Sequence, residues 1–270
     1  MLSRSITVLV AAPLAVALIA RAGTGGFFLL ALLVCLTALY EYYAMALKEP
    51  RTAELCGALA LGALVLGASY ADTAANTHGL AATGACMAAF MLIFTGYICC
   101  GHKSSVPFDR VAILFFGIFY LTLLPSFFLL LRALPQGISL ALFLLFVTWA
   151  GDIGAYLVGR SLGKHRLCPR VSPAKTVEGS CGGMVFSLAV SLVCQATFLN
   201  HIAVPHAVAM AVGINTLNQI GDLSESAIKR SCGVKDSGTI LPGHGGMLDR
   251  IDSLLFAAPF LYYYIRFAGL

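Results

Sequence analysis

Charge is scarce in this 270-residue sequence: Asp, Glu, Lys and Arg together make up only 11% of it. A soluble globular domain carries about 25%. Hydrophobic residues reach 59%, and the mean hydropathy is +0.89. So large and evenly spread an apolar excess excludes an ordinary soluble domain and indicates that the bilayer is the solvent. We expect no nucleic-acid partner.

Zinc-type motifs are also missing. The nine cysteines lie mostly inside apolar runs, and none forms a CxxC or a Cys/His spacing of the zinc type. They are interpreted as small buried hydrophobic residues. The sequence further lacks a water-soluble domain, a low-complexity tract and a clear internal repeat, so its chemistry must sit among membrane segments and their loops.

Apolar runs long enough to span a bilayer, about 20 residues each, dominate what is present. They predict an all-α polytopic integral membrane protein with about nine transmembrane helices. Arg4 and the apolar run behind it resemble a signal peptide, but further runs follow at once, which favours a first membrane helix. The runs are about 5–21, 26–47, 53–71, 78–99, 110–132, 137–159, 179–199, 204–229 and 248–268.

The basic residues predict the orientation. With the N-terminus placed in the cytoplasm, fourteen of the 17 Lys and Arg fall on the inside, and only Arg21, Arg132 and Arg266 fall outside. This bias fits the positive-inside rule. Nine spans then put the C-terminus outside. We expect a multi-pass protein of the inner, cytoplasmic membrane.

Polarity divides the chain into two regions. Residues 1–135 have short loops and few polar residues, and are interpreted as a scaffold for lipid access or oligomer contacts. Residues 136–270 contain two long basic loops, 160–178 and 230–247, both cytoplasmic in this topology. Catalysis is therefore expected in the second region.

A polar stripe runs along the eighth predicted span. Asn215, Asn218, Asp222, Glu225 and Lys229 follow at steps of three and four, which places them on one helical face. A carboxylate inside a membrane helix costs about 2.5–3.5 kcal/mol on insertion scales. The stripe is either an ion-paired contact between helices or, as we favour, part of a functional site.

The densest polar segment follows this span. It holds Lys229-Arg230, Lys235-Asp236, then the glycine-rich run 242–246. Glycines let backbone N–H groups converge on an anion, and Lys and Arg bind phosphate oxygens. Asp249 and Asp252, one turn apart, open the ninth span. Acids facing Asp222 across helices would suit Mg²⁺, which shares phosphate oxygens with its substrate.

A third polar element surrounds the sixth span. Asp152 is the only acid in that span, and Glu178 opens the next one. Lys175 lies where a helix N-terminus could hold a phosphate. A structural role for Asp152, capping or pairing with a nearby cation, stays open. Glu41, flanked by three tyrosines, is interpreted as an interfacial residue.

These motifs resemble the bacterial phosphatidate cytidylyltransferases, or CDP-diacylglycerol synthases. The family signature reads Ser-x-apolar-Lys-Arg, four residues, Lys-Asp, then Pro-x-His-Gly-Gly-apolar-x-Asp-Arg-apolar-Asp, and it runs unbroken from Ser226 through Asp252. Residues 151–179 are also similar. There Ala174 and Val177 replace a Lys and a Trp of the usual pattern, which leaves Lys175 as the cation at that position.

The resemblance implies that CTP and phosphatidic acid yield CDP-diacylglycerol and pyrophosphate, with Mg²⁺ as cofactor and a second cation left open. Residues expected to be catalytic are Asp222, Asp249 and Lys229. Residues expected to bind substrate are Ser172, Lys175, Arg230, Lys235, His244, Gly245, Gly246 and Arg250. Metal ligands are expected to be Asp222 and Asp249, with Asp152, Glu225 and Asp252 as weaker candidates.

Two other functions would also explain polar residues in the membrane segments. An ion-coupled transporter would place polar residues at matching depths from both faces, whereas here they gather toward one face. A CTP-dependent polyprenol kinase would transfer phosphate alone rather than a nucleotide. The expected partners are CTP, phosphatidic acid and membrane lipid, and a homodimer is kept open.

Overall fold

The computed structural model describes residues 13–270, apart from position 15 and the segments 48–50, 100–107 and 239–244. These residues are almost entirely helical, with one small pair of strands. In chain order the elements are α2 (Thr24–Ala46), α3 (Thr52–Ala75), α4 (Leu80–Cys99), α5 (Phe108–Ile118), η1 (Phe119–Leu123), α6 (Leu124–Ala133), α7 (Gly137–Leu162), β1 (Arg166–Cys168), β2 (Ser172–Thr176), α8 (Val177–Thr197), α9 (Val204–Ser231) and α10 (Leu248–Ala268).

The all-α membrane architecture is confirmed. Each predicted run from 26–47 onward corresponds to a helical segment of the described residues, and the last two match α9 and α10 closely. The predicted first span, 5–21, lies largely outside the described residues. Six helical segments in the described part are long and apolar enough to cross a membrane, from α2 to α8 with α5, η1 and α6 taken as one.

Helices α9 and α10 do not meet that test, because polar and charged residues interrupt their apolar runs. Their 28 and 21 residues still correspond to about 42 and 32 Å of helix at 1.5 Å per residue, enough for a hydrocarbon core of about 30 Å. The count of nine spans and the orientation stay predictions.

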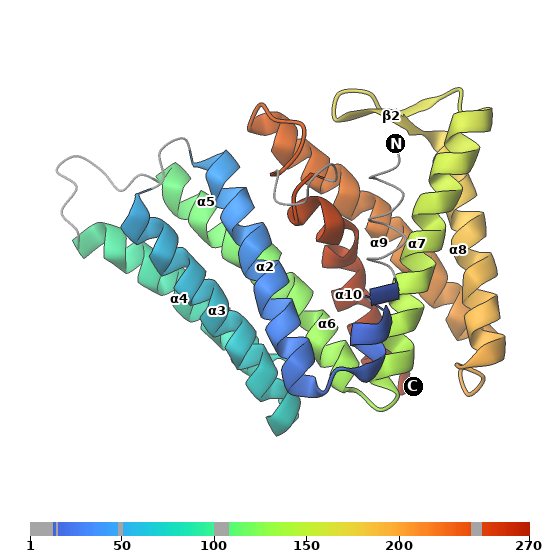
Figure 1. Cartoon of the computed structure of the whole chain (residues 1–270), viewed down its shortest axis with the longest axis horizontal. Coiled ribbons are helices and arrows are strands. Elements are labelled where there is room, and N and C mark those ends of the chain that lie inside the picture. Colours follow the sequence, from blue (N-terminus) through green and yellow to red (C-terminus); the bar gives the residue numbers. More distant parts are fainter. Residues whose placement is uncertain (1–12, 15, 48–50, 100–107, 239–244) are drawn as a thin grey trace.

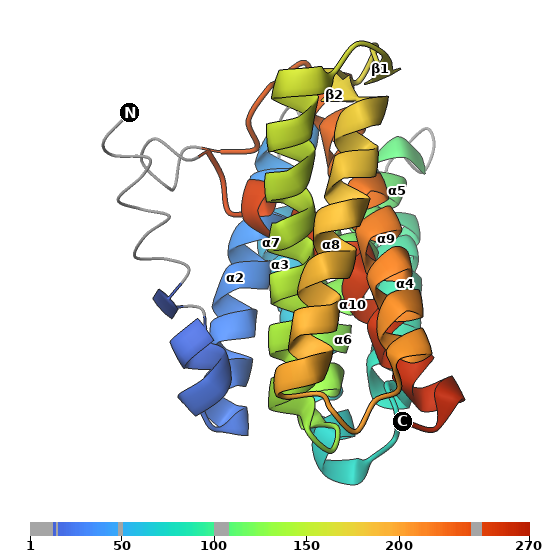
Figure 2. The ribbon, with the colours of Figure 1, turned by 90° about the vertical axis from the view of Figure 1, so that its right-hand side faces the viewer.

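The helices form a bundle in which α9 and α10 lie between two groups. Helices α2–α6 lie on one side and the long pair α7 and α8 on the other (Figure 1). Packing runs from α7 to α8, from α8 to α9, from α9 to α10, and from α10 to α6. In both views the β1–β2 hairpin lies at one end of the bundle and the C-terminus at the other (Figures 1 and 2).

The buried core joins the two regions that the sequence divides near residue 135. Leu248 and Leu255 of α10 pack in one cluster with Tyr43 of α2 and Ile118. Phe127 of α6 packs in a second cluster with residues of α7, α9 and α10. Because α10 contacts both groups of helices, the first region supports the second directly.

The predicted fifth span is a bent segment rather than one regular helix. A π-helical turn, Phe119–Leu123, separates α5 from α6, and Pro125 follows it in the first turn of α6. Proline lacks an N–H for the helical ladder, which favours such a local irregularity. Side chains satisfy part of the disturbed backbone, since the Thr122 hydroxyl donates to the Ile118 carbonyl oxygen at 2.6 Å.

Helices α7 and α8 pack unusually closely because glycines line their contact. A Cβ added at Gly154 would lie 2.7 Å from Phe186 and 2.9 Å from the Gly182 carbonyl oxygen. Small residues let membrane helices approach to backbone contact. A Cβ at Gly151 would likewise collide with the side chain of Asn215. The glycines around Asp152 therefore set how closely α9 can approach it.

The predicted loop 160–178 is more ordered than a loop. Helix α7 continues to Leu162, and β1 pairs antiparallel with β2, with Arg166 opposite Thr176. The hairpin leads straight into α8, whose N-cap Thr176 accepts a hydrogen bond from the Gly179 N–H at 3.1 Å. Glu178 accepts from the Lys164 and His165 N–H groups at 3.0 and 3.2 Å, closing the base of the hairpin.

Candidate active site

The polar stripe of α9 is confirmed as one helical face directed into the bundle. Asn215, Asn218 and Glu225 are almost completely buried, and Asp222 is half-buried. Helix α9 packs against α7, α8 and α10, so this face looks into the space between three helices. Carboxylates placed this deep need cations or hydrogen-bond donors from those helices.

The deep end of the stripe is a hydrogen-bonded network that fixes α9 against α7 and α8. Asn215 Nδ2 donates to Ser187 Oγ at 2.9 Å, and Ser187 Oγ donates to the Val147 carbonyl oxygen at 2.9 Å. Gln219 Nε2 donates to Asn215 Oδ1 at 2.5 Å, and the Ser180 hydroxyl donates to Gln219 Oε1. Buried polar groups satisfied in this way specify one packing of the helices.

Three carboxylates from three helices gather above this network. Asp152 of α7 accepts a hydrogen bond from Asn218 Nδ2 at 2.9 Å. Asp222 of α9 forms an ion pair with Lys175 of β2, with Nζ and Oδ2 2.6 Å apart. Asp252 of α10 is buried, accepts from the Ser253 N–H at 2.8 Å, and lies within electrostatic range of both other acids. Lys175 is the cation in direct contact with this group.

A second ionic group lies one turn further along the stripe. Lys229 Nζ is 2.6 Å from Glu225 Oε2 and 2.6 Å from Asp249 Oδ1, and the lysine side chain is only 11% exposed. One ammonium group thus joins two acids, one from its own helix and one from the start of α10. The sequence predicted that Asp249 faces Asp222, and the structure shows it paired with Lys229.

Asp249 also organises the loop that precedes α10. Its Oδ2 accepts hydrogen bonds from the Gly246 N–H at 2.8 Å and the Ser237 N–H at 3.2 Å, and lies 3.1 Å from Ser237 Oγ. Gly245 has a positive φ of 79°, a conformation that glycine adopts readily. Ser237 and Gly246, on the two described sides of this loop, therefore bind the same carboxylate.

The remaining predicted substrate-binding residues line the same end of the molecule. Arg230 joins the two basic loops, since its Nε donates to the Val171 carbonyl oxygen at 3.4 Å and its Nη1 to that of Val234 at 2.9 Å. Ser172 begins β2 and is half-buried, whereas Lys235 and Arg250 are exposed. His244 lies outside the described residues.

The donor set suits a hard cation, judged by ligand type. Among the five neighbouring carboxylates, Asp222 pairs with Lys175, and Glu225 and Asp249 pair with Lys229. Glu225 Oε1 and Asn218 Oδ1 are buried and have no hydrogen-bond partner in the described residues. All of these donors are oxygens, as Mg²⁺ prefers. The five acids are Asp152, Asp222, Glu225, Asp249 and Asp252.

The described residues contain no group of three or more His, Cys, Asp or Glu side chains close enough to hold a metal by themselves.

Glu41 has a role that the sequence interpretation did not anticipate. It is 3% exposed, and its neighbours Tyr42 and Tyr43 are also buried, so these three side chains lie inside the helix bundle. Its Oε2 accepts from the Leu248 N–H at 3.0 Å and lies 3.2 Å from Ser237 Oγ. A lone acid among aromatic residues gives no sequence signal that would connect it with a loop some 200 residues away.

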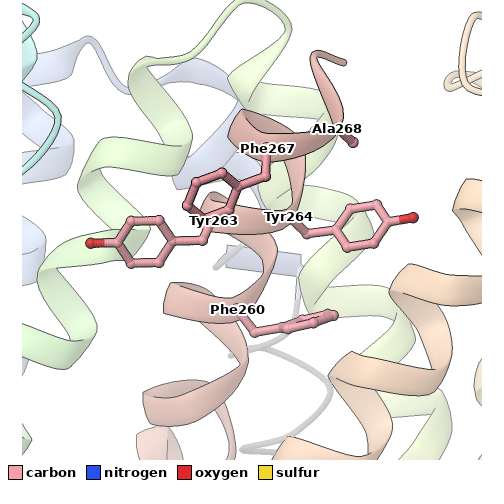
Figure 3. Close-up of a pocket in the computed structure, with 5 residues that line it drawn as sticks. All are labelled: Phe260, Tyr263, Tyr264, Phe267 and Ala268. Carbon is pink, nitrogen blue, oxygen red and sulfur yellow. The ribbon is translucent and has the colours of Figure 1, made fainter.

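A separate aromatic hollow lies at the opposite end of α10. Phe260, Tyr263, Tyr264 and Phe267 line it, and their side chains spread from successive turns toward the C-terminus (Figure 3). It contains none of the predicted site residues. The β1–β2 hairpin, which carries Lys175, lies at the other end of the bundle (Figure 2).

Fold and site together define an α-helical membrane protein with a carboxylate and lysine cluster suited to phosphate-bearing substrates. Residues 2–268 match the model of the cytidylyltransferase family. The chain belongs to that family. It is 38% identical over 228 residues to the phosphatidate cytidylyltransferase of Bacillus subtilis, covering 84% of this chain and 83% of the relative. It is 34% identical over 259 residues to that of Staphylococcus haemolyticus, covering 96% of each. An uncharacterized Escherichia coli protein, YnbB, is 40% identical over 186 residues, which cover 67% of this chain and 62% of YnbB.

Proposed function

We propose that this membrane protein transfers CMP from CTP to phosphatidic acid, giving CDP-diacylglycerol and pyrophosphate. The observation that carries the proposal is the family match over 2–268, joined to a cluster of acids and lysines on three helices and a hairpin. The relatives named phosphatidate cytidylyltransferase cover nearly the whole chain. The enzyme is thus a nucleotidyltransferase of phospholipid biosynthesis.

In this reaction a phosphate oxygen of phosphatidic acid attacks the α-phosphorus of CTP. A new P–O bond forms, and the bond from the α-phosphorus to the oxygen bridging to the β-phosphate breaks, so pyrophosphate leaves. The attacking oxygen already carries negative charge, so no strong general base is required. Positioning and charge neutralisation supply most of the catalysis in such phosphoryl chemistry.

The chain's own residues divide this work. Lys175 and Lys229 are the two ammonium groups inside the cluster, and each can exchange its carboxylate partner for a phosphate oxygen. The Gly246 N–H and the loop around it stay fixed by Asp249. Arg230 holds the hairpin against the loop after α9. These contacts keep two highly charged reactants together despite their repulsion.

Asp222 and Asp249 are proposed to hold Mg²⁺, with Asp152, Glu225 and Asp252 nearby, and a second cation is kept as part of the proposal. When bound, Mg²⁺ neutralises charge on the transferring phosphate oxygens. The buried oxygens Glu225 Oε1 and Asn218 Oδ1, which have no hydrogen-bond partner among the described residues, support this assignment. Asp222, half-buried and paired with the substrate-facing Lys175, is the better exposed of the two.

The site is proposed to face the cytoplasm from the inner membrane. Support comes from the fourteen-to-three charge bias and from the position of the hairpin and the start of α10 at one end of the bundle (Figure 1). At the other end, Asp72 is buried and accepts from the Ala81 and Ala82 N–H groups at 3.0 and 2.8 Å, so it caps α4. Asp72 therefore gives no support for the second set of polar pathway residues that a transporter would need at this end. A homodimer stays a prediction.

The direct test is turnover by the purified protein. CTP, phosphatidic acid and Mg²⁺ should yield pyrophosphate and a lipid that contains cytidine, and omission of Mg²⁺ should stop both. A product that carries phosphate but no cytidine would instead identify a CTP-dependent lipid kinase. Absence of any turnover with correctly inserted protein would refute the proposed reaction.

A further inference from the structure

Glu41 connects the first helical group to the loop of the active site. It lies on α2, near the end of that helix, and its carboxylate is buried. Oε2 accepts from the Leu248 N–H, the first residue of α10, at 3.0 Å. No side chain at the N-cap position Met247 caps this helix. Glu41 therefore acts as the N-cap of α10 from another helix, a place where negative charge is stabilised.

The loop is shaped to admit this carboxylate. A Cβ at Gly238 would lie 2.5 Å from Glu41 Oε1, and one at Gly246 would collide with Glu41 Oε2 and Ser237 Oγ. Glycines at both ends of the loop thus let the backbone close around Glu41. Such close contact between segments far apart in the sequence indicates that the backbone at these glycines is shaped to accommodate the Glu41 side chain.

Glu41 and Asp249 both lie within hydrogen-bond distance of the Ser237 hydroxyl. Ser237 Oγ lies 3.2 Å from Glu41 Oε2 and 3.1 Å from Asp249 Oδ2. A hydroxyl has one proton and can donate to only one of the two acids at a time. The position of Asp249, and through it that of Lys229, therefore depends on Glu41 at two points: through Ser237 and through the backbone of Leu248.

We infer that Glu41 is a positioning residue for cytidylyl transfer, which holds Ser237 and Leu248 so that Asp249 and Lys229 keep their positions. This inference rests on the proposed function. Glu41 itself touches no substrate group in this role. It makes the first helical group part of the catalytic apparatus, because α2 supplies the acceptor that the loop needs.

The test compares Glu41→Leu with Glu41→Gln in the full-length protein. Leu fills the space but accepts no hydrogen bond, whereas the Gln carbonyl can still accept from Leu248 and Ser237. We expect Glu41→Leu to lower kcat on the order of 10- to 100-fold, the effect of misplacing catalytic groups by about 1 Å. Its Mg²⁺ requirement should rise as well. Glu41→Gln should restore most of the activity.

Glu54→Leu is the matched control. Glu54 lies on α3 in the same helical group, is 12% exposed and pairs with Arg51 and Arg110 away from the loop. Its kcat per folded protein and its Mg²⁺ midpoint should stay within about twofold of wild type. Activity is normalised to the folded fraction, measured by thermal unfolding in detergent.

The outcomes are distinguishable. If wild type makes no CDP-diacylglycerol, the proposed function fails. If wild type turns over and Glu41→Leu matches it in kcat and Mg²⁺ midpoint, the positioning role is overturned. If Glu41→Leu fails to insert, Glu41→Asp replaces it: the carboxylate is retained but withdrawn by one methylene, and the same loss of kcat is expected. Normal turnover by Glu41→Asp would then overturn the inference.

Discussion

Lys229 offers the sharpest test of whether the ionic cluster is chemical or only structural. Its ammonium group lies 2.6 Å from Glu225 and 2.6 Å from Asp249, and the three side chains are 11%, 1% and 10% exposed. Lys229→Met keeps much of the aliphatic volume and removes the charge. Two buried carboxylates then face each other without the cation that joins them.

The expected loss of stability follows from that arrangement. Removing one partner of a buried ion pair typically costs about 3–5 kcal/mol, because the remaining charge is left uncompensated. The single variant should therefore unfold at a clearly lower temperature in detergent. In the double variant Lys229→Met with Glu225→Gln, one negative charge is also removed, and most of the lost stability should return.

Activity should separate from stability in the same pair of variants. If Lys229 grips a substrate phosphate, the double variant stays inactive although it folds. The assay follows pyrophosphate release against CTP concentration, per folded protein, at saturating Mg²⁺. Glu225→Gln alone serves as the reference for any contribution of that acid. Recovery of both stability and turnover in the double variant would refute the phosphate role and leave Lys229 as a structural ion pair.

Two further predictions concern the metal and the topology. Asp222→Asn should raise the Mg²⁺ concentration needed for turnover or abolish turnover, and identical Mg²⁺ titrations for this variant and wild type would contradict the ligand role. Lys175→Gln should weaken saturation by CTP or phosphatidic acid with little change in Mg²⁺ dependence. Cysteines placed at Asp236 and Asn76, in a background without reactive native cysteines, should be labelled from the cytoplasm and from the outside respectively; labelling of position 236 only from outside would contradict a site that uses cytoplasmic CTP.

The fold was predictable from hydropathy because a bilayer makes helix formation nearly obligatory for long apolar runs. The runs 204–229 and 248–268 therefore lie close to α9 and α10. The π-helical turn at Phe119–Leu123 was not predictable in this way, since Pro125 can kink, break or merely bend a helix according to its neighbours. The β1–β2 hairpin was hidden for a related reason: its strands are only three and five residues long, and their mixed composition is equally compatible with a loop.

In the site, the sequence predicted which residues share a helical face but not which of them pair. Helical periodicity placed Asn218, Asp222, Glu225 and Lys229 on one face because residues three and four apart are neighbours in any α-helix. Which acid meets which lysine depends instead on how closely α7, α8 and α10 approach that face, and glycine contacts such as that of Gly154 set those approaches.

Glu41 is the extreme case, because nothing in its own neighbourhood indicates a partner. The contact requires both an acid on α2 and two glycines that leave room for it, and neither feature alone predicts it. From the sequence, Gly246 is interpreted as a phosphate-binding glycine. In the structure its missing side chain also admits a carboxylate, and its N–H binds Asp249. A glycine-rich loop beside acids can therefore be glycine-rich because its backbone must approach those acids closely.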